Sequence, residues 1–330
     1  MAPFPTQYST LSAVALKDHV AAAYALQLCA GRYLLRGVSD TYRLESSTAQ
    51  YILKIYRNTH RSRSEIEGEV ALLLHLHAHG SPVAPPLPDQ DGEYLQAFEA
   101  AEGTRYGVLF AFAPGQPVFD LSDAQVQQVG REMARLHNLT AQITLSHPRP
   151  EYNLATTLTQ PLQRLAPVFA AYEYPEGHAY LTETAAFATA RLAALDTAAF
   201  SYGYCHYDFL PKNFHFDAQD QLTFFDFDFA GRGYLVNDVM TFFMHYFLHT
   251  ITKRLSREEA DRAFQLFIAS YRQVRPLSDE ELAAMPYLGF AWWLFYLGFQ
   301  VDHFDDWSNS FFGPRYLRDR VGLIRQWLER

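Results

Sequence analysis

The first 112 residues carry short runs in which apolar and polar positions alternate, separated by turn-forming residues. Alternation of this kind predicts half-buried strands, whereas apolar residues three or four positions apart predict helices. Ile66, Val70, Leu73 and Leu76 follow the helical spacing. We predict helices over residues 12–28 and 63–79 and strands over residues 33–37, 41–46, 50–57, 93–98 and 106–112.

Beyond residue 117 the apolar spacing is mostly helical. Strand-like segments interrupt it only between residues 202 and 229, and Ser256-Arg-Glu-Glu provides an N-cap followed by an acidic first turn. We predict helices over residues 122–137, 159–169 and 180–195, and mainly helical structure from residue 235 onward.

The segment Ala113-Pro114-Gly115-Gln116-Pro117 separates these two patterns. Closely spaced proline and glycine residues favour a connector, so we place a domain boundary there, with domains at residues 1–113 and 114–330. Apolar residues make up 49% of the chain and aromatic residues 15%, which is enough for a large core. The pattern predicts a folded α+β protein.

The chain has a net charge of −9 and no run of Lys or Arg suited to a phosphate backbone, which argues against nucleic acid as a partner. The acidity fits a cationic ligand but is also ordinary. The N-terminus lacks a basic segment followed by an apolar run, and no stretch of about 20 uninterrupted apolar residues follows. We expect a cytoplasmic protein without a membrane partner. Cys29 and Cys205 do not form a disulfide framework.

His206, Asp208 and Asn213 form the pattern H-x-D-x4-N. In protein kinases this is the catalytic loop, where the aspartate accepts the hydroxyl proton and the asparagine binds magnesium. Two short strand-like runs follow, flanking the turn-like segment 217–220, and Asp226 comes after them. A hairpin would return Asp226 to Asn213, and oxygen ligands of this kind suit Mg²⁺.

The segment H-Y-D-F-L-P-K-N resembles H-G-D-L-H-x-G-N of the aminoglycoside phosphotransferase and choline kinase superfamily. The segment F-D-F-D-F-A-G-R-G-Y-L-V-N-D-V is similar to its I-D-F-D-x-A-G-x-G-x-x-x-x-D-L. The resemblance implies a protein kinase-like bilobal fold, with an antiparallel N-lobe sheet and a mostly helical C-lobe, and it implies ATP and Mg²⁺. The resemblance also implies, position by position, that Asp208 would be the base, that Asn213 and Asp226 would bind the metal with Asp228 assisting, and that Asp238 would brace the loop.

Three positions depart from the family pattern: Tyr207, Leu210 and Lys212 stand where Gly, His and Gly are usual. The added bulk would reshape the acceptor side, and Lys212 could contact a phosphate. We expect His206 to brace the loop through hydrogen bonds. A serine hydrolase is disfavoured because the chain has no G-x-S-x-G motif.

In the first domain, Y-I-L-K-I-Y resembles the strand that carries the phosphate-binding lysine, which makes Lys54 the expected ligand of the α and β phosphates. The following helix offers Glu65, Glu67 and Glu69 as its acidic partner, and the family spacing favours Glu69. We expect Arg57 on the surface.

Other nucleotide contacts follow from the same resemblance. Gly37, Ser39 and Asp40 occupy the place of the phosphate-covering loop, whose backbone amides would bind phosphate. Phe112 and Ala113 would belong to a hinge whose backbone reads adenine, and ATP is expected between the lobes.

The sequence leaves the acceptor open. Family members phosphorylate aminoglycosides, choline, homoserine, sugars or, in a stress-response branch, protein Ser/Thr; we favour a small-molecule hydroxyl. A nucleotide-binding pseudokinase scaffold is the remaining alternative. An aromatic and acidic segment fits either an amine pocket or an ordinary helix core, and its polar members are Trp293, Tyr296, Asp302, Asp305 and Asp306. His75, His77 and His79 are expected to form a solvated helix end rather than a metal site.

Overall fold

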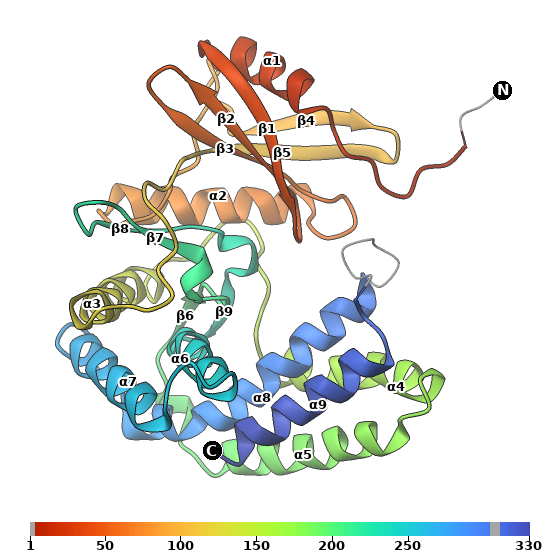
Figure 1. Ribbon diagram of the computed structural model, residues 1–330, viewed down its shortest axis with the longest axis vertical. Coiled ribbons are helices and arrows are strands. Elements are labelled where there is room, and N and C mark those ends of the chain that lie inside the picture. The colour runs from red at the N-terminus through yellow and green to blue at the C-terminus, as the bar shows by residue number, and fades with distance from the viewer. Residues whose placement is uncertain (1–3, 304–310) are drawn as a thin grey trace. The chain divides into compact units, whose positions relative to one another are not determined.

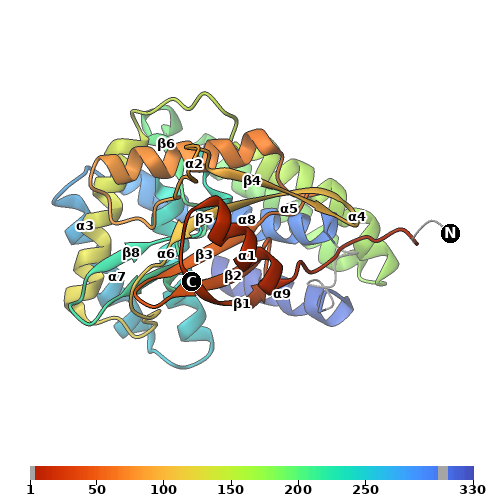
Figure 2. The same cartoon turned by 90° about the horizontal axis from the view of Figure 1, so that it is seen from above.

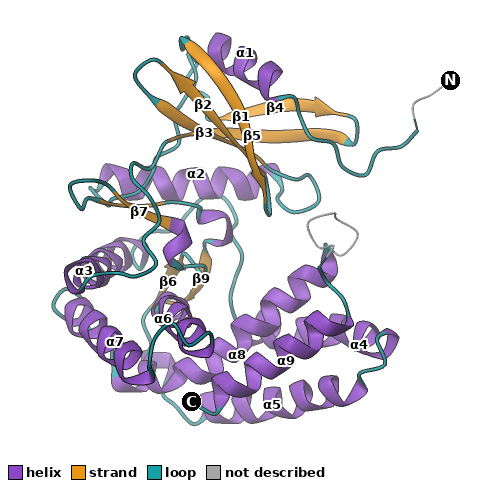
Figure 3. Cartoon of the chain, viewed as in Figure 1, coloured by secondary structure: helices purple, strands orange, loops and turns teal. Residues whose placement is uncertain are grey.

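The computed structural model describes residues 4–303 and 311–330, and it divides the chain into two compact units. Unit 1 contains the described residues up to Gln116 together with Thr144–Arg149 and His215–Phe225, and unit 2 contains the remainder. Figure 3 shows that most of the strands belong to unit 1 and that unit 2 is largely helical.

Unit 1 is built on a five-stranded antiparallel sheet with the order β1-β2-β3-β5-β4. Its strands are β1 (Leu28–Arg36), β2 (Asp40–Ser46), β3 (Gln50–Ile55), β4 (Leu95–Ala100) and β5 (Gly103–Ala111). Helix α1 (Ala13–Ala23) packs Leu16 and Val20 against Tyr42 and Leu53 of the sheet, and Figure 2 shows α1 lying over the strands. Helix α2 (Arg63–Ala78) lies on the opposite side of the sheet (Figure 1).

The first predicted helix is shorter than expected. It begins after the N-cap Ser12 but ends at Ala23, where residues 12–28 were predicted. Ala25 adopts a left-handed conformation with φ of 52°, and β1 begins at Leu28, which pairs with Ser46 of β2. Leu26 and Leu28 continue the helical apolar spacing, so pairing with β2 overrides the local pattern.

A small hairpin formed by β7 (Phe214–Phe216) and β8 (Leu222–Phe224) also belongs to unit 1. Phe216 exchanges two backbone hydrogen bonds of 3.2 Å with Gln116, and Phe224 accepts one of 2.9 Å from Ala84. Gly115 has φ of 88°, and a Cβ there would lie 2.0 Å from the carbonyl oxygen of Phe216. The connector therefore needs glycine at position 115. The pairing of β7 with β8 confirms the predicted hairpin.

Unit 2 packs seven described α-helices around a short two-stranded sheet. The helices are α3 (Asp123–Thr140), α4 (Gln160–Ala171), α5 (Pro175–Ala193), α6 (Val236–Ile251), α7 (Arg257–Arg272), α8 (Asp279–Asp302) and α9 (Pro314–Leu328), and the sheet pairs β6 (Tyr202–Cys205) with β9 (Gly231–Tyr234). Ser122, Ser256 and Ser278 each form a capping box, so α3, α7 and α8 begin where the sequence specifies.

Helix α8 is the central core helix of unit 2. Its Gly298 lies against Pro161 of α4 and its Gly289 against Trp327 of α9, where a Cβ would clash. Within the described residues it alone is long and apolar enough to cross a membrane, but 61% of its apolar window is buried inside the protein. A buried core helix accounts for this composition.

Candidate active site

Asp238, at the start of α6, holds the loop that carries the H-x-D motif. Its carboxylate accepts the backbone N–H of His206 at 2.8 Å and of Tyr207 at 2.7 Å. Nε2 of His137 lies 3.0 Å from the same carboxylate, and Asp238 is fully buried. Two consecutive amides bound to one carboxylate fix the backbone immediately before Asp208, as the resemblance led us to expect for Asp238.

Tyr207 has φ of 65°, a left-handed conformation that L side chains rarely adopt. Its ring stacks on Tyr152 at 3.4 Å, and its carbonyl accepts the indole N–H of Trp292 at 3.0 Å. The left-handed backbone explains why glycine is usual at this motif position. Here, aromatic stacking and the bond from α8 stabilise a tyrosine instead.

Asp208 lies with Asn213 and Lys212 in a tight turn. The Asn213 amide nitrogen donates to the Asp208 carbonyl at 2.7 Å and to its carboxylate at 2.9 Å. Lys212 Nζ lies 2.8 Å from the same carboxylate. Burial lowers the pKa of Lys212, but the carboxylates of Asp208 and Asp226 together raise it more, so its net pKa is above the usual value. Lys212 therefore stays cationic beside the proposed base.

His206 also belongs to this loop. Its Nδ1 lies 3.3 Å from the backbone nitrogen of Asp208, and its ring packs 4.5 Å from Phe227. Only 1% of His206 is exposed. This placement suits a residue that braces the loop.

Asp226 and Asp228 flank the start of the 3-10 turn Phe227–Phe229. Asp226 is left-handed with φ of 63°, and Asp228 is 2% exposed. The charge of Asp226 helps to raise the pKa of Lys212, after the larger effect of Asp208. The carboxylates of Asp208 and Asp226 therefore both favour the charged form of Lys212.

The oxygen atoms of this loop fit a hard divalent cation. Because the Asn213 amide nitrogen is directed at Asp208, its Oδ1 faces away from that residue. Asn213, Asp226 and Asp228 supply amide and carboxylate oxygens only, the donor type that Mg²⁺ prefers. Among residues 4–303 and 311–330 no group of three or more His, Cys, Asp or Glu side chains is arranged to hold a metal ion.

In unit 1 the structure brings Lys54 and Glu69 together. Lys54 Nζ lies 3.7 Å from Glu69 Oε1, with side-chain exposures of 8% and 1%. Arg149 lies 3.8 Å from the other carboxylate oxygen of Glu69 and donates to the Glu65 carbonyl at 2.7 Å. A buried, charge-paired lysine on the third strand is fixed in orientation.

The β1–β2 turn contains Gly37, Ser39 and Asp40. Gly37 N–H donates to the Ser39 carbonyl at 3.0 Å. The fully buried Asp40 carboxylate binds Arg36 at 3.0 Å and Arg105 at 3.1 Å. The side chain of Asp40 thus holds the turn in place.

Arg57 is not on the surface, so that expectation was wrong. It is 3% exposed, its guanidinium donates to the Gly37 carbonyl, and it lies 5.2 Å from the ring centroid of Tyr8. The N-terminal segment carrying Tyr8 brings a partner that the local sequence around Arg57 does not reveal.

At the expected hinge, the Ala113 carbonyl lies 2.8 Å from His215 Nδ1, and the Phe112 ring packs 6.4 Å from the His215 ring. The Ala113 carbonyl therefore already has a partner within unit 1.

Side chains of the aromatic and acidic segment are paired with arginines. The Asp302 carboxylate is paired with Arg164, and the guanidinium of Arg320 lies 5.6 Å from the Trp293 ring. Asp305 and Asp306 lie outside the described residues. A ready-made anionic amine pocket is therefore not found on the described part of this segment.

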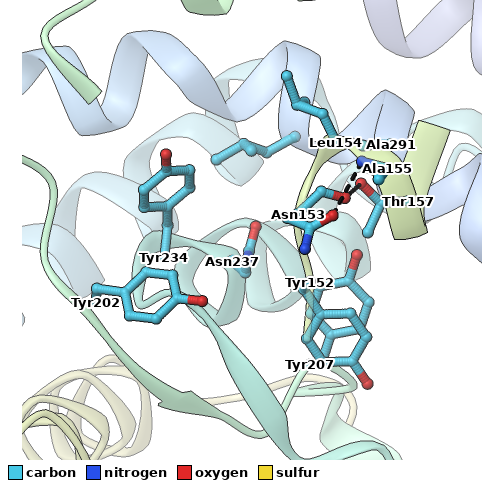
Figure 4. A pocket seen from close by; sticks show the side chains of 11 residues that line it. Tyr152, Asn153, Leu154, Ala155, Thr157, Tyr202, Tyr207, Tyr234, Asn237 and Ala291 are labelled. Carbon is cyan, nitrogen blue, oxygen red and sulfur yellow. Dashed lines mark hydrogen bonds between the residues drawn. The ribbon is translucent and has the colours of Figure 1, made fainter. Parts of the chain in front are cut away.

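A cavity of about 390 Å³ lies elsewhere in unit 2, with Tyr152, Tyr202, Tyr207, Tyr234 and Asn237 among its lining residues (Figure 4). None of its lining residues carries a charge, and Asp208, Asn213 and Asp226 are absent from its wall. Tyr207 is the residue of the H-x-D loop that contributes to the cavity wall.

Residues 31–277 match the phosphotransferase enzyme family. The chain belongs to this family. A protein of unassigned function from Deinococcus radiodurans is 31% identical over 327 residues, which span 99% of this chain and 93% of that protein. The amicoumacin kinase of Bacillus subtilis is 29% identical over 225 residues, covering 66% of this chain and 64% of the kinase.

A solved amicoumacin kinase, in complex with AMP-PNP and Ca²⁺, has the same fold, with a TM-score of 0.70 at 22% identity. The match covers 94% of this chain and 93% of that one. The family and the α+β kinase-like fold expected from the sequence are thereby confirmed, and this phosphotransferase is an enzyme.

Sequence reasoning missed several residues that support the site. His137 contacts Asp238 and lies 2.7 Å from the Tyr271 hydroxyl, and Trp292 binds the loop from α8. No motif marks them, because their partners lie 101 and 85 positions away in the chain. The one available signal was that His137, a polar residue, falls on the apolar face of α3.

Proposed function

We propose that this phosphotransferase moves the γ-phosphate of ATP to a hydroxyl group of a small molecule, with Asp208 as the base. The observation that carries the proposal is the arrangement around Asp208. Its backbone is fixed through Asp238, and its carboxylate is held by Asn213 and Lys212. Phosphoryl transfer asks a protein mainly for alignment and charge neutralisation, and this loop is built for alignment.

In the proposed reaction the acceptor hydroxyl gives its proton to Asp208 as its oxygen bonds to the γ-phosphorus. The bond between that phosphorus and the β–γ bridging oxygen breaks, and ADP leaves with the electron pair. The hydrogen bonds from Asn213 and Lys212 point the carboxylate toward one position, which favours a single acceptor orientation.

Unit 1 carries the proposed ligands of the triphosphate. Lys54, oriented by Glu69, is proposed to bind the α and β phosphates, with backbone amides of the turn at Gly37 and Ser39 covering them. Asn213, Asp226 and Asp228 would hold Mg²⁺, which supplies charge neutralisation for the phosphates. Phe112 and Ala113 are proposed to line the adenine.

A small-molecule acceptor is favoured because the related kinases named above act on amicoumacin. Two alternatives are a kinase with a protein Ser/Thr acceptor and a scaffold that binds nucleotide without catalysis. An ADP-release assay distinguishes both of them from a small-molecule kinase. ADP release from MgATP is measured with homoserine, choline, ethanolamine, aminoglycosides, sugars and a Ser/Thr-rich protein as acceptors.

The decisive variant is Asp208→Asn, with Asp196→Asn as the matched control. Replacing Asp196 by Asn makes the same chemical change at an exposed position outside the site. We expect acceptor-dependent turnover to fall about 10²- to 10⁴-fold in Asp208→Asn and to be unchanged in the control. Turnover retained in Asp208→Asn would remove the base assignment, and ATP binding without turnover on any acceptor would favour the scaffold.

A further inference from the structure

The cavity of about 390 Å³ in unit 2 connects the surface with the interior of that unit. At its exposed end lie Leu154 and Tyr202, each 39% exposed. Its buried wall includes Tyr207, Asn237 and Ala291, none of which is more than 4% exposed. A small molecule can therefore enter from solvent and be largely enclosed, as in most ligand sites of this size.

Asn237 places an amide in this cavity, and Figure 4 shows it between two pairs of tyrosines. Burial raises the pKa of the Cys205 thiol, and a hydrogen bond from the Asn237 side chain opposes this effect, so the amide N–H faces the sulfur. No protein group in residues 4–303 and 311–330 donates to the amide oxygen of Asn237. A buried polar atom without a partner is costly and uncommon. This oxygen is therefore available to a donor on a ligand.

A second feature of the wall is a single turn of π-helix, Ala155–Thr159. Such turns are rare, and they occur frequently at functional sites. The side-chain oxygen of Asn153, just before this turn, accepts the backbone N–H groups of Ala155 at 3.0 Å and Thr156 at 3.1 Å. The NH₂ group of Asn153 is directed the other way (Figure 4). The wall thus offers an amide donor as well as the Asn237 acceptor.

The wall also limits the charge of a ligand. No lining residue carries a charge, so a buried anion such as a nucleotide would lose its hydration without gaining a cationic partner. A cation would find no carboxylate on the wall, and the Arg232 guanidinium already lies 5.4 Å from the ring centroid of Tyr202. Tyrosine rings and amides suit an uncharged planar ring.

We propose that this cavity is a binding site for an uncharged aromatic compound that carries an N–H or O–H donor, which the Asn237 oxygen accepts. Asp208, Asn213 and Asp226 do not line the cavity, so the proposal goes beyond the phosphoryl transfer and does not depend on it. Tyr207 does line the cavity and directly precedes Asp208. A bound compound therefore contacts the loop that carries the proposed base.

The first test measures binding to the free protein, without ATP or an acceptor, by ligand-observed NMR titration. Three indoles of similar size serve as probes: indole-3-acetamide is uncharged, indole-3-acetate is an anion and tryptamine is a cation. We expect a Kd of about 1 mM or lower for indole-3-acetamide and at least about tenfold weaker binding of the two charged probes. Failure of indole-3-acetamide to bind, or equal binding of all three probes, would overturn the proposal.

The second test fills the cavity from α8. Ala291→Leu adds methyl groups at the cavity wall, and Ala283→Leu makes the same change at an exposed position of the same helix. We expect Ala291→Leu to weaken binding of indole-3-acetamide at least about tenfold and Ala283→Leu to leave it unchanged. Asn237→Leu, which removes the acceptor, should weaken binding about three- to tenfold. Wild-type affinity in Ala291→Leu would place the probe elsewhere, and wild-type affinity in Asn237→Leu would remove the assigned hydrogen bond; either result contradicts the proposal.

Two further measurements guard against a variant that only misfolds. Because the added methyl groups enter open space, the melting temperature of Ala291→Leu should be no lower than that of Ala283→Leu, and a marked fall would mean that the cavity is not there. In the wild type, indole-3-acetamide should slow amide hydrogen exchange in residues 152–157 and 202–207. Protection confined to other segments would show that the probe binds elsewhere and that the proposal is wrong.

Discussion

Replacing Asp238 by Asn tests how the active-site loop is held. The carboxylate accepts three polar contacts, from His206 N at 2.8 Å, Tyr207 N at 2.7 Å and His137 Nε2 at 3.0 Å. An asparagine offers one oxygen and one NH₂ group, so at least one backbone N–H would face another donor. The substitution keeps the shape of the side chain and removes its charge and half of its acceptor capacity.

The expected cost follows from these contacts. One buried amide left without an acceptor costs about 1–3 kcal/mol, and the remaining bonds lose the extra strength that a charged acceptor provides. We therefore expect Asp238→Asn to lower the free energy of unfolding by about 2–4 kcal/mol. Because Tyr207 is held in a left-handed conformation partly by this bond, kcat should also fall at least about tenfold.

Urea unfolding followed by fluorescence gives the stability change, and the ADP-release assay gives kcat. The control is Asp319→Asn, whose side chain is 68% exposed and lies 3.8 Å from Arg315. An exposed pair of this kind contributes about 0–1 kcal/mol. If Asp238→Asn were no less stable than Asp319→Asn, the carboxylate would not be bracing the loop, and the reasoning would be refuted.

Three further substitutions test other parts of the structure. Both Tyr207→Ala and Tyr207→Gly should lower the free energy of unfolding by about 2–4 kcal/mol. Glycine should be the milder change by about 1 kcal/mol because the backbone at this position has φ of 65°. Urea unfolding measures both differences. Lys54→Met should lower kcat/KM for ATP about 100-fold in steady-state assays, while the control Lys17→Met, which removes a partly exposed lysine paired with Asp18, should not. Burial, the larger cause, and the neighbouring His249 lower the pKa of the His245 imidazole to about 4. The neutral imidazole therefore contributes fully to the free energy of unfolding above pH 6.5. This contribution is lost as the pH falls toward 4, and the loss is at most about 3 kcal/mol. His245→Gln can keep the bond to the Phe119 carbonyl, and its unfolding free energy should change less between pH 7 and 4.5; an equal change would contradict this assignment.

Local chemistry made several parts of the fold predictable from the sequence. The β7–β8 hairpin could be placed because Asp217 lies in a turn-forming run, and in the structure its carboxylate accepts the N–H groups of Gln219 and Gln221, both at 2.8 Å. Ser256 could be named as an N-cap for the same reason. In both cases the deciding contacts lie within four residues of each other.

The rest could not be predicted, because the deciding partners are distant in sequence. The sequence suggests that Arg57 is a surface residue after a strand, but in the structure it is buried near Tyr8, which lies 49 positions earlier in the chain. Asp40 reads as a loop carboxylate near phosphate, yet Arg105, 65 positions later, binds it. Burial of a charged side chain requires such a partner, and only the folded chain identifies it.

The two left-handed residues in the active-site loops show how the motif tolerates its departures from the family pattern. Tyr207 and Asp226 have φ of 65° and 63°, and each lies one or two positions from a proposed catalytic or metal-binding carboxylate. Such a conformation costs about 1–2 kcal/mol in an L residue, so surrounding contacts must stabilise it. At Tyr207 these contacts are made by Asp238, which accepts the backbone N–H, and by Trp292, which donates to the carbonyl. Since Trp292 lies on α8, this helix helps to hold the backbone immediately before the proposed base. A relative with glycine after His206 should therefore tolerate other side chains at the position of Trp292.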